Sequence, residues 1–393
     1  MIEDQFMGNL YQRFPVTIEK GKGSHVWDVD GKEYIDCMGG YGVALVGHQN
    51  QRVVEAIKEQ VDKIITVHSS VYNKTREEFL KLLIHLAPKG LTQVHLNNSG
   101  AEAVEAAMKF ARKFTGKKGM VAMKGSYHGK SFGALSLTFN PKYRKAFQPL
   151  VEKVSFASYG DIESLREVID EDTAFVILEP IQGESGIIVP PDGFLQDVRK
   201  LCDEKGILLI FDEIQAGLGR TGRLWACQHW DTTPDIMCLA KGIAGGVPMG
   251  ATLVRPDILA SISKGEHSST FGGNPLSCAA GIAALKALTE DGLIENSEKM
   301  GKIFREGLEK LKDKHSSIRE IRGKGLMIGV EMKFEIRDIL MNLIKEGVLM
   351  LYSGRNILRI LPPLVISEED IAKVLQSLDS VLSREEEKRS AQG

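Results

Sequence analysis

The sequence predicts an α/β protein with a mainly parallel central sheet, helices on both faces of that sheet, and a smaller α+β domain. Three observations predict this fold class. From about residue 94 to residue 254, short apolar runs alternate with helical patterns, as they do where helices connect parallel strands. After about residue 276 the pattern changes to long helical stretches. An alternating pattern around Asp30 and Gly31 indicates a hairpin, which we expect to pack with the carboxyl-terminal part.

In the central region, strands and helices are expected to follow one another in turn. Apolar residues at positions 104, 107, 108 and 111 recur at the spacing of one helix face, so a helix is expected after Ala101. The expected strands are Gln93–Asn97, Met120–Lys124, Phe175–Glu179, Leu208–Asp212, Ile236–Leu239 and Ala251–Val254.

The carboxyl-terminal region is expected to begin with one long helical stretch from Ser277 to Leu311 and to end in a last helix. Ser367 followed by Asp370 resembles a capping box that opens this helix, which we expect to fray into a charged tail from Ser383. These patterns divide the chain into a large domain, residues 48–275, and a small domain formed by residues 1–47 and 276–393.

Composition and charge exclude several classes of protein. The 50 basic and 52 acidic residues give a formal net charge of -2, so no global basic field favours nucleic acid or a membrane surface. The amino terminus is acidic where a secretory signal would be basic, and no apolar run approaches the roughly 20 residues that span a bilayer. The five cysteines are odd in number and never spaced as Cys-x-x-Cys, which disfavours disulfides and zinc. We expect a cytoplasmic protein without a metal centre.

The most informative feature is an aspartate at the end of an apolar run, followed 29 residues later by a lysine. Asp212 ends an expected strand, and ligands of open α/β sheets bind at the carboxyl ends of such strands. An acid there serves a metal, a ribose hydroxyl or a cationic ring nitrogen. Pyridoxal phosphate needs both residues: Lys241 to bond to its aldehyde, and the acid to keep its ring nitrogen protonated. A strand-end acid that caps a helix, with a solvated lysine, explains the pair equally well.

Weaker motifs surround this pair. Ser99 begins a helix whose free N–H groups suit phosphate, although an ordinary serine N-cap is the simpler explanation. Tyr127 follows another strand end, where its ring could stack on a flat cofactor or pack in a loop. The hydroxyl residues of 268–275 could donate to phosphate or form a plain turn. Arg359, alone in an apolar run, could receive a carboxylate in a fork or form a structural ion pair with Glu184.

A glycine-rich segment offers a competing interpretation. Residues 217–222 match Gly-x-Gly-x-x-Gly, the dinucleotide-binding fingerprint. That fingerprint requires the first glycine to end the strand directly and a helix to open on the loop. Here residues 212–216 intervene and no helix start follows, so dinucleotide binding is disfavoured.

In this order, the motifs resemble those of the class III pyridoxal-phosphate-dependent aminotransferases, which share the fold type I of such transferases. The resemblance covers almost the entire chain, and the run after Asn140-Pro141 is most similar to acetylornithine aminotransferases and their lysine-pathway relatives. The segments that carry it are 99–103 (Ser-Gly-Ala-Glu-Ala), 127–129 (Tyr-His-Gly), 178–184 (Leu-Glu-Pro-Ile-Gln-Gly-Glu), 211–215 (Phe-Asp-Glu-Ile-Gln), 239–242 (Leu-Ala-Lys-Gly), 270–275 (Thr-Phe-Gly-Gly-Asn-Pro) and 359–363 (Arg-Ile-Leu-Pro-Pro).

The resemblance implies a cofactor role for each matching residue. Lys241 would bond to the pyridoxal phosphate and, once released, move the proton at the substrate Cα, while Asp212 would keep the ring nitrogen protonated. Gln215 would meet the ring hydroxyl, and Tyr127 would stack on the ring. The residues implied for the phosphate are Ser99, Gly100 and Ala101, the last two through backbone N–H groups.

The resemblance also implies how substrates and subunits meet. Arg359 would bind the α-carboxylate of glutamate, and Glu184 would mask it when the second substrate enters. Ser269 and Lys130 would contact that second substrate. Thr270 would reach the phosphate in the neighbouring active site, which implies a homodimer.

The implied reaction moves an amino group between glutamate or 2-oxoglutarate and a terminal aldehyde. Our first interpretation is a lysine precursor, and also an ornithine precursor, linked to the small acidic carrier protein LysW. Lys130 and residues 142–145 (Lys-Tyr-Arg-Lys) could face that carrier, although a solvated basic surface explains them equally well. The alternative is transamination of free N-acetylornithine in arginine biosynthesis. Two departures bear on specificity: Ala101 replaces a frequent threonine, and Lys130 replaces the usual arginine, whose fork an ammonium group does not reproduce.

Overall fold

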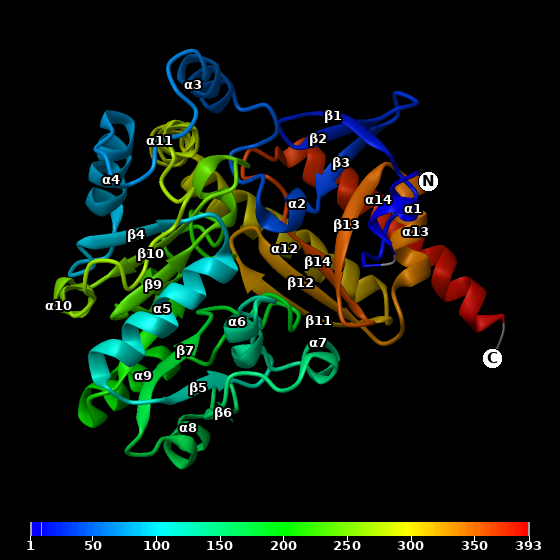
Figure 1. The fold of residues 1–393 in the computed structure, drawn as a ribbon. Coiled ribbons are helices and arrows are strands. Elements are labelled where there is room, and N and C mark those ends of the chain that lie inside the picture. Colours follow the sequence, from blue (N-terminus) through cyan, green and yellow to red (C-terminus); the bar gives the residue numbers. More distant parts are fainter. Residues whose placement is uncertain (1, 9, 392–393) are drawn as a thin grey trace.

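The computed structural model of the chain describes residues 2–8 and 10–391. Two seven-stranded sheets lie side by side, with helices around each (Figure 1). The predicted fold class, a parallel-rich α/β sheet with a smaller α+β part, is confirmed.

The larger sheet has the order β4-β10-β9-β8-β7-β5-β6. Only β10 among the described strands of this sheet runs antiparallel to its neighbours. All six predicted strands are present, with ends shifted by at most two residues. The strands are β4 (Gln93–Asn97), β5 (Gly119–Met123), β6 (Val154–Ala157), β7 (Thr173–Leu178), β8 (Leu208–Asp212), β9 (Ile236–Leu239) and β10 (Gly250–Val254).

Helices cover both faces of this sheet because its central strands are apolar on both faces. In β8, Leu208 and Ile210 pack in one hydrophobic cluster, whereas Leu209 and Phe211 pack in the other. Such strands, buried on both faces, are typical of parallel sheets. The helices of this part are α3 (Gln51–Val61), α4 (Lys74–Leu86), α5 (Gly100–Thr115), α6 (Phe132–Leu137), α7 (Pro141–Arg144), α8 (Ile162–Val168), α9 (Phe194–Lys205), α10 (Pro256–Ala260) and α11 (Pro275–Glu290), with 3-10 turns η1 (Lys145–Phe147), η2 (Ala226–Trp230) and η3 (Lys241–Ala244).

The second sheet joins the two ends of the chain, in the order β1-β2-β3-β13-β14-β12-β11. The predicted hairpin is β2 and β3, and β3 pairs in parallel with β13 from the carboxyl-terminal region. The residue limits of the two domains stay a prediction. The strands are β1 (Ile18–Lys22), β2 (His25–Asp28), β3 (Glu33–Cys37), β11 (Ile318–Lys324), β12 (Met327–Met332), β13 (Val348–Ser353) and β14 (Ile357–Ile360), and the helices are α1 (Ile2–Met7), α2 (Gly39–Gly42), α12 (Leu293–Lys314), α13 (Arg337–Lys345) and α14 (Glu368–Ser390).

Two expectations about the helices were wrong. The stretch from Ser277 to Leu311 is not one helix, because Gly292 adopts a left-handed conformation (φ 70°) that separates α11 from α12. The last helix does not fray from Ser383 but continues to Ser390. In its last turns, the carboxylate of buried Glu385 forms an ion pair with Arg389. Its predicted capping box at Ser367 is confirmed. Residues 392–393 of the predicted tail lie outside the described residues.

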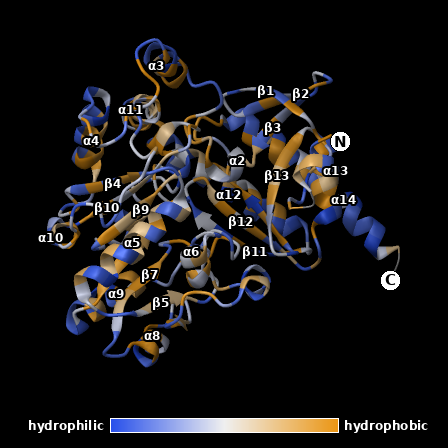
Figure 2. Ribbon diagram, in the orientation of Figure 1, coloured by the Kyte–Doolittle hydropathy of each residue, from blue (hydrophilic) through white to orange (hydrophobic). Residues whose placement is uncertain are grey.

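Apolar residues concentrate in the strands and on the inner faces of the helices, and the exposed end of α14 is hydrophilic (Figure 2). Among the described residues, no helix is long and apolar enough to cross a membrane.

Candidate active site

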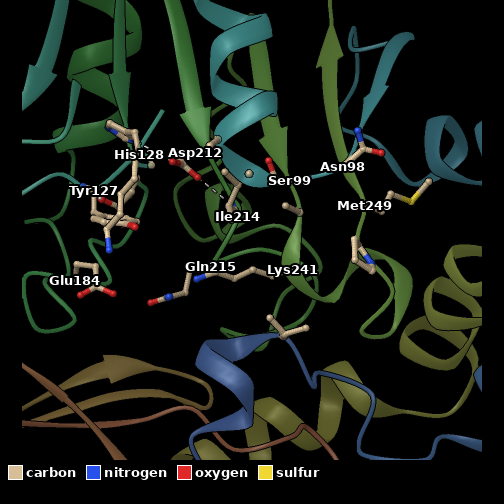
Figure 3. Close-up of a pocket in the computed structure, with 18 of the residues that line it drawn as sticks. Asn98, Ser99, Tyr127, His128, Glu184, Asp212, Ile214, Gln215, Lys241 and Met249 are labelled. Carbon is tan, nitrogen blue, oxygen red and sulfur yellow. Dashed lines mark hydrogen bonds and ion pairs between the residues drawn. The ribbon is translucent and has the colours of Figure 1, made fainter. Parts of the chain in front are cut away.

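A cavity of about 420 Å³ opens where the strands of the larger sheet end (Figure 3). The residues that follow β4, β5, β7, β8 and β9 all contribute to its wall, because the carboxyl ends of parallel strands meet at one edge. Of the predicted site residues, the cavity brings together Ser99, Gly100, Ala101, Tyr127, Lys130, Glu184, Asp212, Gln215 and Lys241.

Asp212 is held at the bottom of this cavity by a histidine. Its Oδ2 lies 2.7 Å from Nδ1 of His128, and its Oδ1 accepts a hydrogen bond from the backbone N–H of Ile214 at 3.1 Å. His128 is buried, and its Nε2 atom has no hydrogen-bond partner among the residues that the structure describes. His128 was not predicted to have a role, although its place after β5, beside Tyr127, was the available signal. The pair fixes a buried negative charge that suits a cationic ring.

Lys241 opens the 3-10 turn η3 directly after β9. Its φ of 50° is left-handed, a strained conformation for a residue other than glycine and one that concentrates at functional sites. Enclosure by the protein lowers the pKa of the ammonium group to about 8, and the nearby positive charge of Arg359 acts in the same direction. A larger fraction of the amine is therefore neutral and nucleophilic near pH 7 than for an ordinary lysine.

The start of helix α5 forms one wall of the cavity. Ser99 is the N-cap, and its Oγ accepts a hydrogen bond from the N–H of Glu102 at 3.2 Å. Gly100 and Ala101 then place the first turn of the helix against the cavity. A Cβ atom on Gly100 would lie 2.9 Å from Cδ1 of Ile214, which explains the glycine. The serine cap and an anion-binding helix start are thus compatible.

Tyr127 and Gln215 line two other sides. The Tyr127 ring packs edge-on against Tyr143, with centroids 5.7 Å apart. The Oε1 atom of Gln215 is buried, and no described residue forms a hydrogen bond with it. Glu179, which the sequence analysis left without a role, accepts the backbone N–H groups of Tyr127 and Gly183, and burial raises the pKa of its carboxyl to about 7. It ends an expected strand as Asp212 does, and that was the signal that could have found it.

Arg359 does not line the cavity but lies behind Glu184, which does. The Arg359 side chain, in β14, is fully buried, and its Nη1 lies 3.1 Å from Oε1 of Glu184. This contact is an ion pair without a hydrogen bond, and among residues 2–8 and 10–391 the guanidinium N–H groups have no hydrogen-bond acceptor. The Tyr41 ring lies 5.5 Å from the guanidinium. This guanidinium could bind a carboxylate through two parallel N–H···O hydrogen bonds.

The remaining predicted residues lie at the edge of the cavity or apart from it. Lys130 is exposed at its rim, with Nζ 5.2 Å from the ring of Tyr143. Ser269 lines a second cavity, of about 1130 Å³, and its Oγ accepts a hydrogen bond from Nδ2 of Asn98, a residue of the first cavity. Thr270 is exposed and lines neither cavity. Within one subunit, the structure does not bring Thr270 to the predicted site residues that line the first cavity.

The geometry is that of a site for a cationic ring, an anionic group and a reactive amine, and comparison with known proteins decides the family. The family model for aminotransferase class III matches residues 6–382.

This chain belongs to the class III aminotransferases.

The class III family depends on pyridoxal phosphate, and its members are transaminases. Two curated relatives differ in their substrates. The acetylornithine aminotransferase of Methanopyrus kandleri is 46% identical over 96% of this chain and 97% of its own length. The [LysW]-aminoadipate semialdehyde/glutamate semialdehyde transaminase of Sulfurisphaera tokodaii is 44% identical over 97% of this chain and 98% of its own length.

Solved structures of class III aminotransferases have the same fold. An ornithine aminotransferase from Toxoplasma gondii, with pyridoxal phosphate partly occupying its active site, is 34% identical over 99% of this chain and 94% of its own, with a TM-score of 0.96. The prediction of a pyridoxal-phosphate-dependent transaminase is therefore confirmed, and the relatives leave the second substrate divided between the two alternatives.

Proposed function

We propose that this class III aminotransferase moves an amino group between glutamate or 2-oxoglutarate and the terminal aldehyde of a lysine precursor, or of the shorter ornithine precursor, linked to an acidic carrier protein such as LysW. The observation that carries the choice of a carrier-linked substrate is a group of three exposed lysines: Lys130 lines the cavity, and Lys142 and Lys145 lie on the α7–η1 segment, whose Tyr143 contacts Lys130. Free N-acetylornithine is the second candidate, favoured by the 46% identity to the Methanopyrus kandleri enzyme.

The cavity fits the cofactor of the family. Pyridoxal phosphate, when bound, supplies a cationic ring that withdraws electrons from the substrate Cα. Ser99, Gly100 and Ala101 would hold its phosphate at the start of α5, where free N–H groups and the helix dipole favour an anion. Asp212 would hold the ring nitrogen, and the unsatisfied Oε1 of Gln215 would accept the ring hydroxyl. Tyr127 would cover the ring.

The proton at the substrate Cα would be moved by Lys241. A base is most effective when its pKa lies near the working pH, and the pKa of about 8 meets that condition. His128 would keep the Asp212 carboxylate in place through the 2.7 Å contact. Asp212 and His128 would thus hold a negative charge at the ring nitrogen, and Lys241 would move the proton.

Arg359 and Glu184 would let one cavity accept two different substrates. When glutamate enters, its α-carboxylate would replace Glu184 at the guanidinium and make the fork that Glu184 does not make. When the second substrate presents an uncharged end, Glu184 would stay on Arg359 and neutralise it. The 3.1 Å ion pair in this structure corresponds to the second arrangement.

The carrier-linked substrate is supported by charges at the cavity rim. Lys130, Lys142 and Lys145 are exposed, and each is without an acidic partner among residues 2–8 and 10–391. Arg144 of the predicted basic cluster instead turns inward, with its guanidinium 4.9 Å from the Phe156 ring. An acidic carrier would be attracted to these three lysines and deliver its linked aldehyde to the cavity.

A homodimer is proposed from the surface around Thr270. Large apolar side chains are exposed there: Phe271 at 62%, Val71 at 55% and Ile65 at 51%. Burial of such a patch between two subunits would remove apolar surface from water. It would also bring Thr270 to the phosphate site of the neighbouring subunit.

Substrate preference is tested by comparing catalytic efficiency on carrier-linked and free acetylated substrates at low and high salt. We expect a preference for the carrier-linked substrate that weakens with salt, and its loss in the double variant Lys142→Ala/Lys145→Ala. The matched control is Lys299→Ala/Lys302→Ala, which removes two exposed lysines from α12. Equal efficiency on both substrates, with no salt dependence, would remove the carrier proposal and leave free N-acetylornithine.

The cofactor assignment is tested separately. The reconstituted protein should absorb visible light, lose that absorbance on borohydride reduction, and show neither property in Lys241→Ala. A colourless reconstituted wild type would contradict the assignment. Sedimentation analysis tests the homodimer, and a monomer with full activity would exclude a role for Thr270 across subunits.

A further inference from the structure

We infer that Arg220 is a positioning residue that fixes the strand bearing Arg359 relative to the loop that follows Asp212, the last residue of β8. The inference rests on the proposed role of Arg359 as the receptor of a substrate carboxylate. Arg220 belongs to the glycine-rich segment 217–222, which has no part in the cavity described above.

The segment starts five residues after Asp212 and turns away from the cavity toward the smaller sheet. It is not a helix start, so it does not act as a dinucleotide loop. Its glycines permit close packing: a Cβ on Gly217 would lie 2.7 Å from the carbonyl oxygen of Glu213, and Gly222 has a φ of 87°. Leu218, buried with a φ of 58°, holds a strained conformation that packing must maintain.

Arg220 crosses to the smaller sheet and contacts it at two points. Its Nη1 donates hydrogen bonds to the carbonyl oxygens of Leu326, at 3.0 Å, and Pro362, at 2.6 Å. Its own carbonyl accepts from the N–H of Leu326 at 3.0 Å and from Oγ of Ser297 at 3.0 Å. One side chain thus joins the loop after β8 to two separate segments of the smaller sheet.

These two segments set the position of Arg359. Leu326 precedes β12, and Pro362 follows β14, the strand that contains Arg359. The two strands pair in antiparallel register, with Gly329 opposite Arg359. Gly329 in turn packs against the turn after Glu184, because a Cβ there would lie 2.8 Å from the carbonyl oxygen of Gly186. Arg220 therefore holds the start of β12 and the end of β14, the adjacent ends of the strand pair that carries the proposed carboxylate receptor.

The charge of Arg220 is costly for a purely structural residue. It is fully buried, its Nε and Nη2 atoms have no hydrogen-bond partners within residues 2–8 and 10–391, and burial lowers the pKa of the guanidinium to about 9. Asp36 offsets this only through its charge, since its carboxylate is bonded to His48 and to backbone N–H groups. Apolar residues often replace such buried charges without loss of stability. An apolar residue would not bond to the carbonyl oxygens of Leu326 and Pro362, so it would not fix their distance from the loop that follows Asp212.

The test compares Arg220→Met with the matched control Arg305→Met. Arg305, on α12, also donates to a backbone carbonyl in the β11–β12 turn, that of Gly325 at 3.0 Å, but it lies within the smaller domain and does not reach the Asp212 loop. Three properties are measured. The first is the dissociation constant of glutarate, a dicarboxylate that does not react, determined by calorimetry. The others are the KM values of glutamate and free N-acetylornithine, and the melting temperature.

We expect Arg220→Met to weaken glutarate binding and raise the KM of glutamate by about tenfold or more, because a displacement of roughly 1 Å at a binding group has effects of this size. The KM of N-acetylornithine should change by less than about twofold, since only interactions through Arg359 are lost. Arg305→Met should leave all three constants unchanged. Should Arg220→Met fail to fold, Arg220→Lys, which keeps the charge but not the planar fork, decides by the same comparison.

Equal changes in both variants, equal changes for both substrates, or a lowered melting temperature with unchanged constants would overturn the inference. Arg359→Ala separates this failure from failure of the proposed function. If Arg359→Ala binds glutarate as the wild type does, the proposed role of Arg359 is wrong and the inference fails with it. If Arg359→Ala loses binding and Arg220→Met does not, the inference alone fails.

Discussion

Gly100→Ala should weaken cofactor binding by an amount that follows from one contact. The new Cβ would lie 2.9 Å from Cδ1 and 3.1 Å from Cγ2 of Ile214, both closer than carbon atoms normally approach. Ile214 lines the cavity, so a shift of its side chain away from the new Cβ would change the wall of the proposed ring site. Overpacking of this kind costs about 1–3 kcal/mol. The dissociation constant of pyridoxal phosphate, measured by absorbance titration, should therefore rise about 5- to 150-fold.

A second variant isolates the cause. Ile214→Val removes Cδ1, the closer of the two atoms, while Cγ2 remains. Gly100→Ala/Ile214→Val should therefore recover part of the affinity, with a coupling energy above about 0.5 kcal/mol in the double-mutant cycle. Additive effects of the two substitutions, or unchanged binding in Gly100→Ala, would refute the reasoning that this glycine is required by Ile214.

Three further results are expected. In the apoenzyme, capture of Lys241 by an aldehyde and borohydride should speed up about tenfold per pH unit and level off near pH 8, because only the neutral amine reacts; a rise that continues beyond pH 10 would indicate an ordinary lysine. Hydrogen bonding to Lys314 lowers the pKa of Asp379, so its stabilising contribution is present above the usual carboxyl pKa and is lost as pH falls through the folded value. Chemical unfolding between about pH 5 and pH 2 should show a smaller loss of stability in Asp379→Asn than in the wild type. Glu184→Gln should lower the KM of glutamate and raise that of the second substrate, because Arg359 then has no neutralising partner; parallel changes in both KM values would contradict this.

The sequence was sufficient for the elements that carry a strong local signal. Leu208–Asp212 and Ile236–Leu239 are strands with the predicted ends, because uninterrupted apolar runs between loops have few alternatives in a buried sheet. Val154–Ala157 was missed, since this edge strand is short and only partly buried, and it shows no such run. Gly292 was overlooked inside an otherwise helical pattern, although a left-handed glycine is a common end of a helix.

Site residues could be predicted where they end a strand, because the topology brings strand ends together. Asp212, Tyr127 and Lys241 follow that rule and line one cavity. The contact between His128 and Asp212 spans 84 residues, and no local pattern indicates which neighbour an acid meets. Thr270 could not be placed at the site by any argument within one chain, because the structure leaves it exposed and away from the cavity.

Buried polar groups without hydrogen bonds lower the stability of the fold, and their positions show where that cost is concentrated. Native proteins leave few buried polar atoms without a hydrogen bond, yet within the described part of the chain His128 Nε2, Gln215 Oε1 and the Arg359 guanidinium have none, in or beside one cavity. Lys241 adds a strained backbone at the same place. Such costs persist where a ligand or a second conformation offsets them. Arg220 has the same signature but lies outside the cavity, so the offset there must come from what it holds in position.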